Sequence, residues 1–259
     1  MKEILIPALI LGGLGLFFGA LLAFAGIIFK VKKDERIQLI EETLPGANCG
    51  GCGFSGCGGY AEAIVSGEAP CNLCAVGGAE VAKYISEVMG VQSEFVKKYA
   101  YLHCTGGAYQ RYVYEGIEDC TYANNLAGGR KSCTYGCLGL GSCAKACPVG
   151  AIDVIEGVPT VNKNKCTGCG VCKRTCPRGL FEIMPESTKI IVKCSSHDKT
   201  IDMKNSCPDG CIACRKCERG CPEDAIKVID NLARIDYDKC VHCGNCVENC
   251  PKKIISYIE

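Results

Sequence analysis

The longest hydrophobic segment of the chain lies at its start, where no charged residue occurs from Ile4 to Phe29. A helix needs about 20 apolar residues to cross a bilayer, so this pattern predicts a transmembrane helix. A cleaved signal peptide is the competing interpretation, because residues 23–25 resemble a small-residue cleavage site. We favour a retained anchor over residues 1–33, since the apolar core of a signal peptide is only roughly 7–15 residues long.

Basic residues follow this segment directly, and they predict the orientation of the anchor. They are Lys30, Lys32, Lys33 and Arg36. The positive-inside rule places such residues on the cytoplasmic side. We therefore expect a single pass through the cytoplasmic membrane, with the later residues in the cytoplasm.

Beyond the anchor, the hydrophobic pattern predicts short elements of an α+β fold. Residues 78–89 carry apolar side chains at helical spacing, which predicts an amphipathic helix. Apolar and aromatic residues at 95–101 indicate a buried strand. Alternating segments at 151–162 and 225–236, each interrupted by a turn, predict two β-hairpins.

The two hairpins belong to an internal repeat. A shift of 74 residues aligns residues 132–177 with residues 206–251 without a gap, and most of their cysteines coincide. We therefore expect two tandem units, and the domain boundaries follow from them. The expected domains are an anchor at 1–33, a small domain at 34–90, a connecting segment at 91–131, and units at 132–193 and 194–259.

Cysteine dominates the composition, with 25 cysteines among 259 residues. Such a count indicates either disulfides or bound metal. Runs of C-x2-C in a chain of this length favour reduced thiolates inside the cell, and an odd total excludes complete pairing. The formal net charge is only +1 and no block of Lys and Arg occurs, so the composition predicts no nucleic-acid partner.

The C-terminal unit contains two C-x2-C-x2-C-x3-C-P runs, which is the spacing of two-cluster bacterial ferredoxins. Three cysteines of each run hold one [4Fe–4S] cluster, and the fourth serves the other cluster. The expected ligand sets are Cys211, Cys214, Cys217 and Cys250 for one cluster, and Cys240, Cys243, Cys246 and Cys221 for the other. Zinc is the competing metal, because four thiolates also bind zinc. His242 lies within the second run, where we expect a solvated loop histidine.

The first unit departs from this pattern at Leu140, which occupies the repeat position of Cys214. Another thiolate must replace the missing ligand, and Cys133 is the nearest candidate. The expected sets are then Cys133, Cys137, Cys143 and Cys176 for one cluster, and Cys166, Cys169, Cys172 and Cys147 for the other. A three-iron cluster with a vacant corner is the alternative.

A further cysteine loop lies close to the anchor, where Cys49, Cys52 and Cys57 occur in a glycine-rich segment. Glycines allow the backbone to approach a bound group closely. Three thiolates leave one iron of a cluster without a ligand. The spacing alone allows either Cys71 or Cys74 to complete the set.

The sequence LPGANCGGCGFSGC at 44–57, followed by CAVGG at 74–78, resembles the single-cluster domain of the B subunit of the Rnf complex, a membrane-bound ion-translocating ferredoxin:NAD+ oxidoreductase. A related domain occurs in corrinoid iron–sulfur proteins. The order of anchor, single-cluster domain and ferredoxin units also resembles that subunit, so the resemblance covers nearly the whole chain. It implies Cys74 as the fourth ligand. It further implies a translocase subunit that takes electrons from soluble ferredoxin and passes them to membrane and peripheral partner subunits.

Five clusters use twenty of the cysteines, and five cysteines remain. These are Cys71, Cys104, Cys120, Cys194 and Cys207. If Cys71 is a spare, the other four provide the thiolates for a sixth cluster that joins the two units. Free cysteines that act as small buried hydrophobes are the alternative.

No catalytic motif accompanies the cysteines. The sequence has no G-x-G-x-x-G between a predicted strand and helix, no H-E-x-x-H and no G-x-S-x-G. We therefore expect an electron carrier without catalytic residues, in which NAD and flavin belong to partner subunits. The alternatives are a polyferredoxin of a hydrogenase or formate dehydrogenase complex, a structural zinc protein, and a corrinoid methyl carrier, for which the chain lacks room.

Overall fold

The computed structural model describes residues 2–28 and 34–258, with side chains at 11–25 and 34–258. Helix α1 (Lys2–Ile28) covers most of the expected anchor. Its large described apolar side chains are exposed, for example Leu16 at 79% and Phe24 at 66%. Within the described residues, no helix has the length and hydropathy of a membrane span. Residues 29–33, on which the expected orientation largely depends, lie outside the described residues.

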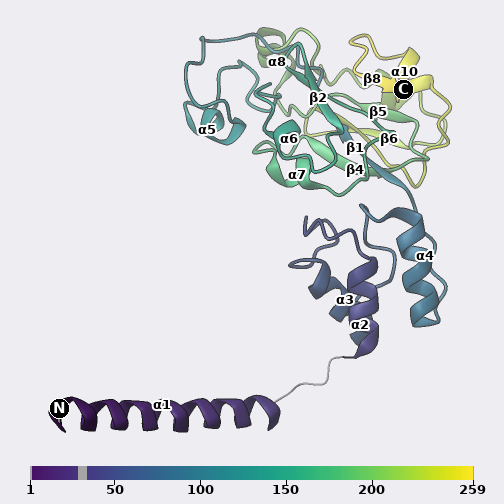
Figure 1. Ribbon diagram of the computed structural model, residues 1–259. Coiled ribbons are helices and arrows are strands. Elements are labelled where there is room, and N and C mark those ends of the chain that lie inside the picture. Colours follow the sequence, from purple (N-terminus) through teal and green to yellow (C-terminus); the bar gives the residue numbers. More distant parts are fainter. Residues whose placement is uncertain (1, 29–33, 259) are drawn as a thin grey trace.

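A small helical domain follows (Figure 1). It consists of α2 (Glu35–Thr43), α3 (Cys57–Ser66) and α4 (Gly78–Met89). Asp34 caps α2, because its carboxylate accepts a hydrogen bond from the Arg36 backbone N–H at 2.9 Å. Buried side chains of all three helices form one core, among them Ile40, Tyr60 and Ile85. The helix predicted at 78–89 is confirmed as α4.

The first ferredoxin-like unit has two antiparallel strand pairs. Its elements are β1 (Lys98–Leu102), α5 (Cys120–Asn125), α6 (Ser142–Lys145), β2 (Ile152–Ile155), β3 (Val158–Val161), α7 (Val171–Thr175) and β4 (Phe181–Pro185). β2 pairs with β3 as the predicted hairpin, and β1 pairs with β4. Positive φ angles at Glu156 and Gly157 form the hairpin turn. The strand expected at 95–101 is shorter at its start than predicted, because Val96 is exposed and pairing begins at Lys98.

The second unit repeats this arrangement. Its elements are β5 (Ile190–Val192), α8 (Thr200–Ser206), α9 (Lys216–Arg219), β6 (Ile226–Ile229), β7 (Leu232–Ile235), α10 (Asn245–Glu248) and β8 (Ile255–Tyr257). β6 pairs with β7 as the second predicted hairpin, and β5 pairs with β8. In each unit a strand before the cysteine runs therefore pairs with the strand after them.

This pairing changes the expected domain boundaries. β1 falls in the segment that we expected only to connect domains, yet it completes the sheet of the first unit. β5 falls before the expected boundary at 194, yet it completes the sheet of the second unit. Both units thus begin earlier in the chain than the cysteine repeat indicates.

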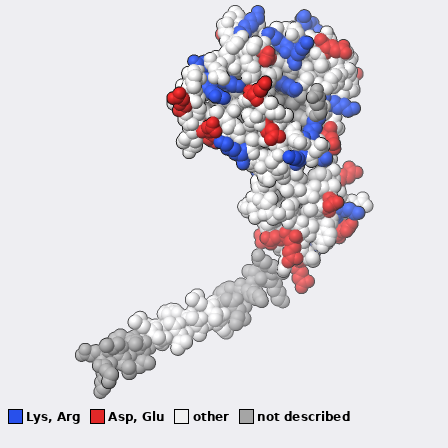
Figure 2. Space-filling view, turned by 45° about the horizontal axis from the view of Figure 1, so that its top comes forward, with Lys and Arg blue, Asp and Glu red and all other residues white. Residues whose placement is uncertain are grey.

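Charged side chains are mixed on the surface. Figure 2 shows Lys and Arg interspersed with Asp and Glu on the viewed face of the ferredoxin-like units. No extended field of one sign covers that face.

The small core clusters of the units include cysteines, such as Cys211, Cys217 and Cys246 beside Ile226 and Ile254.

Candidate iron–sulfur centres

The second unit has two cavities, and each is lined by four cysteines. One is lined by Cys211, Cys214, Cys217 and Cys250 together with Ile212, Val228 and Ile254. The other is lined by Cys221, Cys240, Cys243 and Cys246 together with Ile190, Ile226 and Ile235. The structure therefore brings together both sets that the ferredoxin spacing predicts, including the exchange of the fourth cysteines.

The chemistry of these two cavities fits a bound cationic group. Burial raises the pKa of the Cys217 and Cys246 thiols to about 11, so thiolates there need compensating positive charge. The Ala225 backbone N–H donates to Cys221 Sγ at 3.3 Å, as it would to a thiolate ligand. His242 lines the second cavity, and its buried Nε2 has no hydrogen-bond partner in the described protein. The expected solvated histidine is thus half-buried, and its unpartnered nitrogen suits a group with acceptor sulfurs.

The first unit has a matching cavity with an unexpected fourth cysteine. It is lined by Cys120, Cys137, Cys143 and Cys176 together with Leu102, Leu138 and Phe181. Cys133, the ligand expected from the sequence, does not line it and packs instead against Met203 and Cys207. Burial raises the pKa of Cys137 and Cys143 to about 12, so here too thiolates require a cation.

A hydrogen-bond network carries Cys120 into this cavity. Asp119 caps α5 by accepting from the Thr121 backbone N–H at 2.8 Å, and it accepts from Ser142 Oγ at 2.7 Å. Ser142 Oγ in turn accepts from the Cys120 backbone N–H at 2.7 Å. These bonds hold the start of α5 against the start of α6. Sequence proximity favoured Cys133, and no local motif marks Cys120 as its replacement.

The other set of the first unit also converges. Burial raises the pKa of Cys172 to about 12, and the neighbouring Cys166, Cys169 and Cys147 thiolates add to this rise. The Ala151 backbone N–H donates to Cys147 Sγ at 3.3 Å. Cys172 and Cys143 belong to one buried core, so the two sets of this unit are neighbours.

In the N-terminal domain, one cavity is lined by Cys49, Cys52, Cys57 and Cys74. Tyr60 fixes the returning loop, because its hydroxyl donates to the Pro70 carbonyl at 2.7 Å and accepts from the Leu73 N–H at 2.9 Å. Cys71 does not line the cavity and is buried in the helical core. The spacing allowed either Cys71 or Cys74 as the fourth ligand, and the structure brings Cys74 to the other three cysteines.

This cavity abuts the first ferredoxin-like unit. Cys169 also lines it. A Cβ added to Gly51 would lie 2.7 Å from the Cys169 carbonyl oxygen, so the two loops are in close contact. Arg174 secures the contact, since its Nη2 donates to the Cys49 carbonyl at 2.9 Å.

Four further cysteines lie outside these five sets, in addition to Cys71. They are Cys104, Cys133, Cys194 and Cys207. The sixth set expected from the sequence contained Cys120 in place of Cys133. In the structure Cys120 lines the cavity of Cys137, and Cys133 packs beside Cys207 instead. In the described parts of the chain, no three His, Cys, Asp or Glu side chains are arranged as ligands of a single metal ion.

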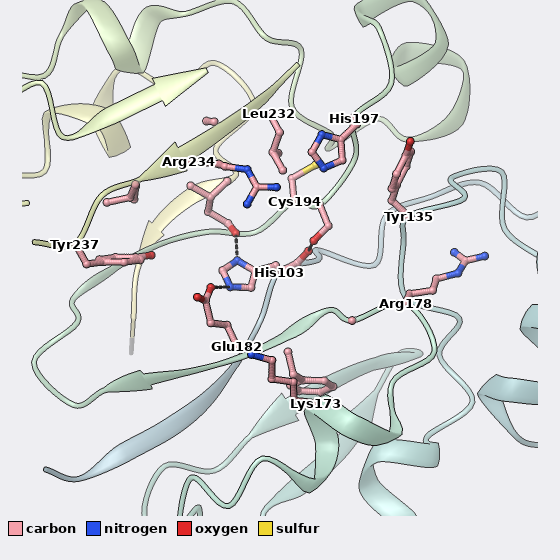
Figure 3. Close-up of a pocket in the computed structure, with 16 residues that line it drawn as sticks. His103, Tyr135, Lys173, Arg178, Glu182, Cys194, His197, Leu232, Arg234 and Tyr237 are labelled. Atoms are coloured by element: carbon pink, nitrogen blue, oxygen red, sulfur yellow. Dashed lines mark hydrogen bonds and ion pairs between the residues drawn. The ribbon is translucent and has the colours of Figure 1, made fainter. Parts of the chain in front are cut away.

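A large cavity of about 530 Å³ lies between the two units, and Cys194 is the one cysteine among its lining residues (Figure 3). Lys173, Arg178 and Arg234 line it together with His103 and Glu182. His103 Nδ1 lies 2.8 Å from the Val192 carbonyl oxygen, and its Nε2 lies 2.9 Å from Glu182 Oε2. Through these two contacts of its ring nitrogens, His103 connects β4 to β5.

Comparisons with known proteins agree with this geometry. Three family profiles match the chain, namely an Fe-S cluster domain at residues 44–76, a 4Fe-4S binding domain at 158–181 and a 4Fe-4S dicluster domain at 210–254. The B subunit of the ion-translocating oxidoreductase complex of Methanosarcina acetivorans is 48% identical over 92% of this chain and 93% of its own length.

Two bacterial relatives are similar over the same extent of the chain. The B subunit of the Na+-translocating ferredoxin:NAD+ oxidoreductase complex of Acetobacterium woodii is 46% identical over 92% of this chain and 73% of its own length. The B subunit of the proton-translocating ferredoxin:NAD+ oxidoreductase complex of Clostridium ljungdahlii is 40% identical over 91% of this chain and 85% of its own length.

Proposed function

Because this chain belongs to the family of B subunits of ion-translocating ferredoxin:NAD+ oxidoreductase complexes, the Rnf complexes, we propose a route for the electrons that it carries. The chain is an iron–sulfur electron-transfer subunit of such a complex. The route passes through five [4Fe–4S] clusters, one at each of the five cysteine sets. When bound, a cluster takes up or releases one electron.

The observation that carries this proposal is the grouping of cysteines in fours. Each of four cavities is lined by one set of four cysteines among apolar side chains, with Cys169 of a neighbouring set also at the N-terminal cavity. The fifth set converges around Cys172. Four thiols and few other polar groups suit a cluster that exchanges electrons without exchanging protons. The chain positions the clusters and excludes water from them.

Exposure indicates where electrons enter. Cys243 is the one exposed cysteine among the 25, all of which the structure describes. A soluble donor can therefore come closest to the cluster of the set that contains Cys243. We propose that reduced ferredoxin docks at the loop that carries Cys243, beside the exposed Val241.

The close contact of Gly51 with Cys169 supports the other end of the route. It joins the first ferredoxin-like unit to the N-terminal domain, whose first helix begins at Glu35, directly after the segment next to α1. Electrons then leave from the Cys49 set toward membrane subunits. Entry at the second unit and exit at the N-terminal domain place the whole chain between donor and membrane.

A single-pass anchor at residues 4–29, with the iron–sulfur domains in the cytoplasm, is part of this proposal. Its support is the row of exposed apolar side chains on α1, from Leu11 to Phe24. An exposed apolar surface of this kind marks a site of contact with lipid or with another protein. In sealed inside-out vesicles, protease should degrade the residues after 34, and their protection would contradict this orientation.

The function is tested by mixing anaerobically purified complex with reduced ferredoxin. Freeze-quenched electron paramagnetic resonance should show the clusters of the chain becoming reduced as ferredoxin is oxidised, and Val241→Asp should slow this transfer several-fold while iron content stays unchanged. Ile201→Asp is the matched control, because Ile201 is also exposed but lies on α8. Equal rates of electron transfer from ferredoxin in Val241→Asp and Ile201→Asp would show that ferredoxin docks elsewhere. A colourless, zinc-replete protein, or a hydrogenase as the co-purifying partner, would overturn the function itself.

A further inference from the structure

Four cysteines that belong to none of the five sets lie on segments that pack together. Cys104 and Cys133 come from the first unit, and Cys194 and Cys207 from the second. The Tyr109 backbone N–H donates to the Ser206 carbonyl at 3.1 Å, which brings the segment after Cys104 beside the segment before Cys207. The Tyr135 and His197 rings meet edge to face at 5.5 Å, which brings the loop of Cys133 beside that of Cys194.

The four cysteines lie on segments that meet at the loop of Cys133. Cys133 and Cys207 are buried in one apolar cluster, at 5% and 8% exposure. The backbone N–H of Cys137, in the loop of Cys133, donates to Cys104 Sγ at 3.3 Å. Tyr135 of the same loop contacts His197, three residues after Cys194.

The sulfurs of Cys104 and Cys194 accept the same type of hydrogen bond as the cysteines of the five sets. Cys104 Sγ accepts from the Cys137 backbone N–H at 3.3 Å. Cys194 Sγ accepts from the Cys211 backbone N–H at 3.4 Å. Backbone N–H groups that point at sulfur stabilise thiolate ligands and tune cluster potentials.

These contacts are related by the internal repeat. Cys137 and Cys211 are equivalent under the shift of 74 residues, as are Cys133 and Cys207. Cys104 follows the end of β1 by two residues, and Cys194 follows the end of β5 by two residues. Each unit thus supplies two cysteines in equivalent structural positions, although Cys104 and Cys194 are not aligned by the shift.

We propose that Cys104, Cys133, Cys194 and Cys207 hold a sixth [4Fe–4S] cluster, at the junction of the two units. The inference rests on the proposed function, since it assumes that the five other sets hold clusters. The sixth cluster lies between the set that contains Cys137 and the set that contains Cys211. It passes one electron at a time between them, so that as one neighbour is oxidised the other is reduced, with no bond made or broken.

Cys71 provides the contrast within the same chain. It is equally buried, at 5% exposure, but it packs in an apolar helical core. Cys71 therefore remains a free thiol and serves as the control.

The test compares iron content and spectra of the whole chain, purified anaerobically as wild type, Cys104→Ser, Cys207→Ala and Cys71→Ala. Six four-iron clusters require about 24 iron ions per chain and five require about 20. The wild type and Cys71→Ala should contain about 24, and the other two variants about four fewer. Each of these two should also lose about one sixth of the spins seen by electron paramagnetic resonance after full reduction.

The outcomes separate this inference from the proposed function. A wild type with about 20 iron ions, or a full iron content in both Cys104→Ser and Cys207→Ala, overturns the sixth cluster while the function stands. A wild type without iron overturns the function. If a variant unfolds and loses all iron, the wild-type count of 24 or 20 still decides the question.

Discussion

Gly51 lies so close to Cys169 that a Cβ on Gly51 would stand 2.7 Å from the Cys169 carbonyl oxygen. The two residues belong to different domains and to different cysteine sets. Because backbone cannot yield as a flexible side chain does, this contact fixes how closely the two sets approach. It is the point at which the proposed route crosses from the ferredoxin-like units to the N-terminal domain.

Gly51→Ala should therefore separate these two sets without dismantling either. Overpacking of this kind costs about 1–3 kcal/mol, which weakens the domain contact by a factor of roughly 5 to 100. We expect slower reduction of the N-terminal cluster in stopped-flow experiments, with unchanged iron content. Gly12→Ala is the control, since nothing lies within 4 Å of a Cβ there. Equal rates in the two variants would show that electrons do not cross at Gly51.

Cys120 should be the fourth ligand of the set that contains Cys137. Cys120→Ser should then remove between one and four iron ions per chain, depending on whether a three-iron cluster survives. Adding Leu140→Cys should restore them, because Leu140 occupies the position of Cys214 and the following residues, Gly141 and Arg215, share a positive φ.

The same rescue should fail in Cys133→Ser, because Cys133 does not line this cavity. Iron analysis and paramagnetic resonance of the single and double variants provide the measurement. Rescue of Cys133→Ser by Leu140→Cys would restore the ligand set first expected from the sequence.

Arg178 should raise the potential of the clusters around it. Its half-buried guanidinium donates to the Cys133 carbonyl at 2.9 Å and to Asn124 Oδ1 at 3.1 Å. A nearby positive charge stabilises the reduced, more negative state of a cluster. Arg178→Met should remove on the order of 1 kcal/mol of stabilisation from the reduced state of a nearby cluster. This corresponds to a reduction potential lower by roughly 40 mV for a one-electron couple.

Arg178→Lys separates charge from hydrogen bonding at this position. It keeps the positive charge but loses the planar fork of donors. Redox titrations should show potentials near those of the wild type for Arg178→Lys and lower ones for Arg178→Met. A common shift in both variants would instead assign the effect to the loop that Arg178 holds.

Removal of iron should unfold the ferredoxin-like units. Their small cores include the cysteines themselves, as Cys211 and Cys217 do beside Ile226. Domains of about 60 residues are marginal on burial alone, so metal binding supplies much of their folding free energy. Near-UV circular dichroism should disappear after complete chelation under reducing conditions. A native spectrum in iron-free protein would mean that the apolar core suffices.

The sequence predicts the parts of this protein that depend on short-range spacing. The runs around Cys211 and Cys240, the two hairpins and α4 all follow from local periodicity, because neighbouring residues determine them. The strand partners of β1 and β5 do not, since each pairs with a strand more than 60 positions away. For the same reason, the sequence indicated Cys133 and not Cys120 for the set that contains Cys137. Cys133 is close to Cys137 along the chain, whereas the Asp119 and Ser142 network that positions Cys120 exists only in the folded unit.

The equivalent positions of Cys104 and Cys194 have a consequence for the ancestry of the tandem units. In the proposed sixth cluster each unit supplies two of the four cysteines, so a single copy would complete the set only as a homodimer. Linking two copies in one chain replaces that dimerisation by an intramolecular encounter, which no longer depends on protein concentration. The covalent linkage also permits the two halves to diverge, as Leu140 in one copy and Cys214 in the other show.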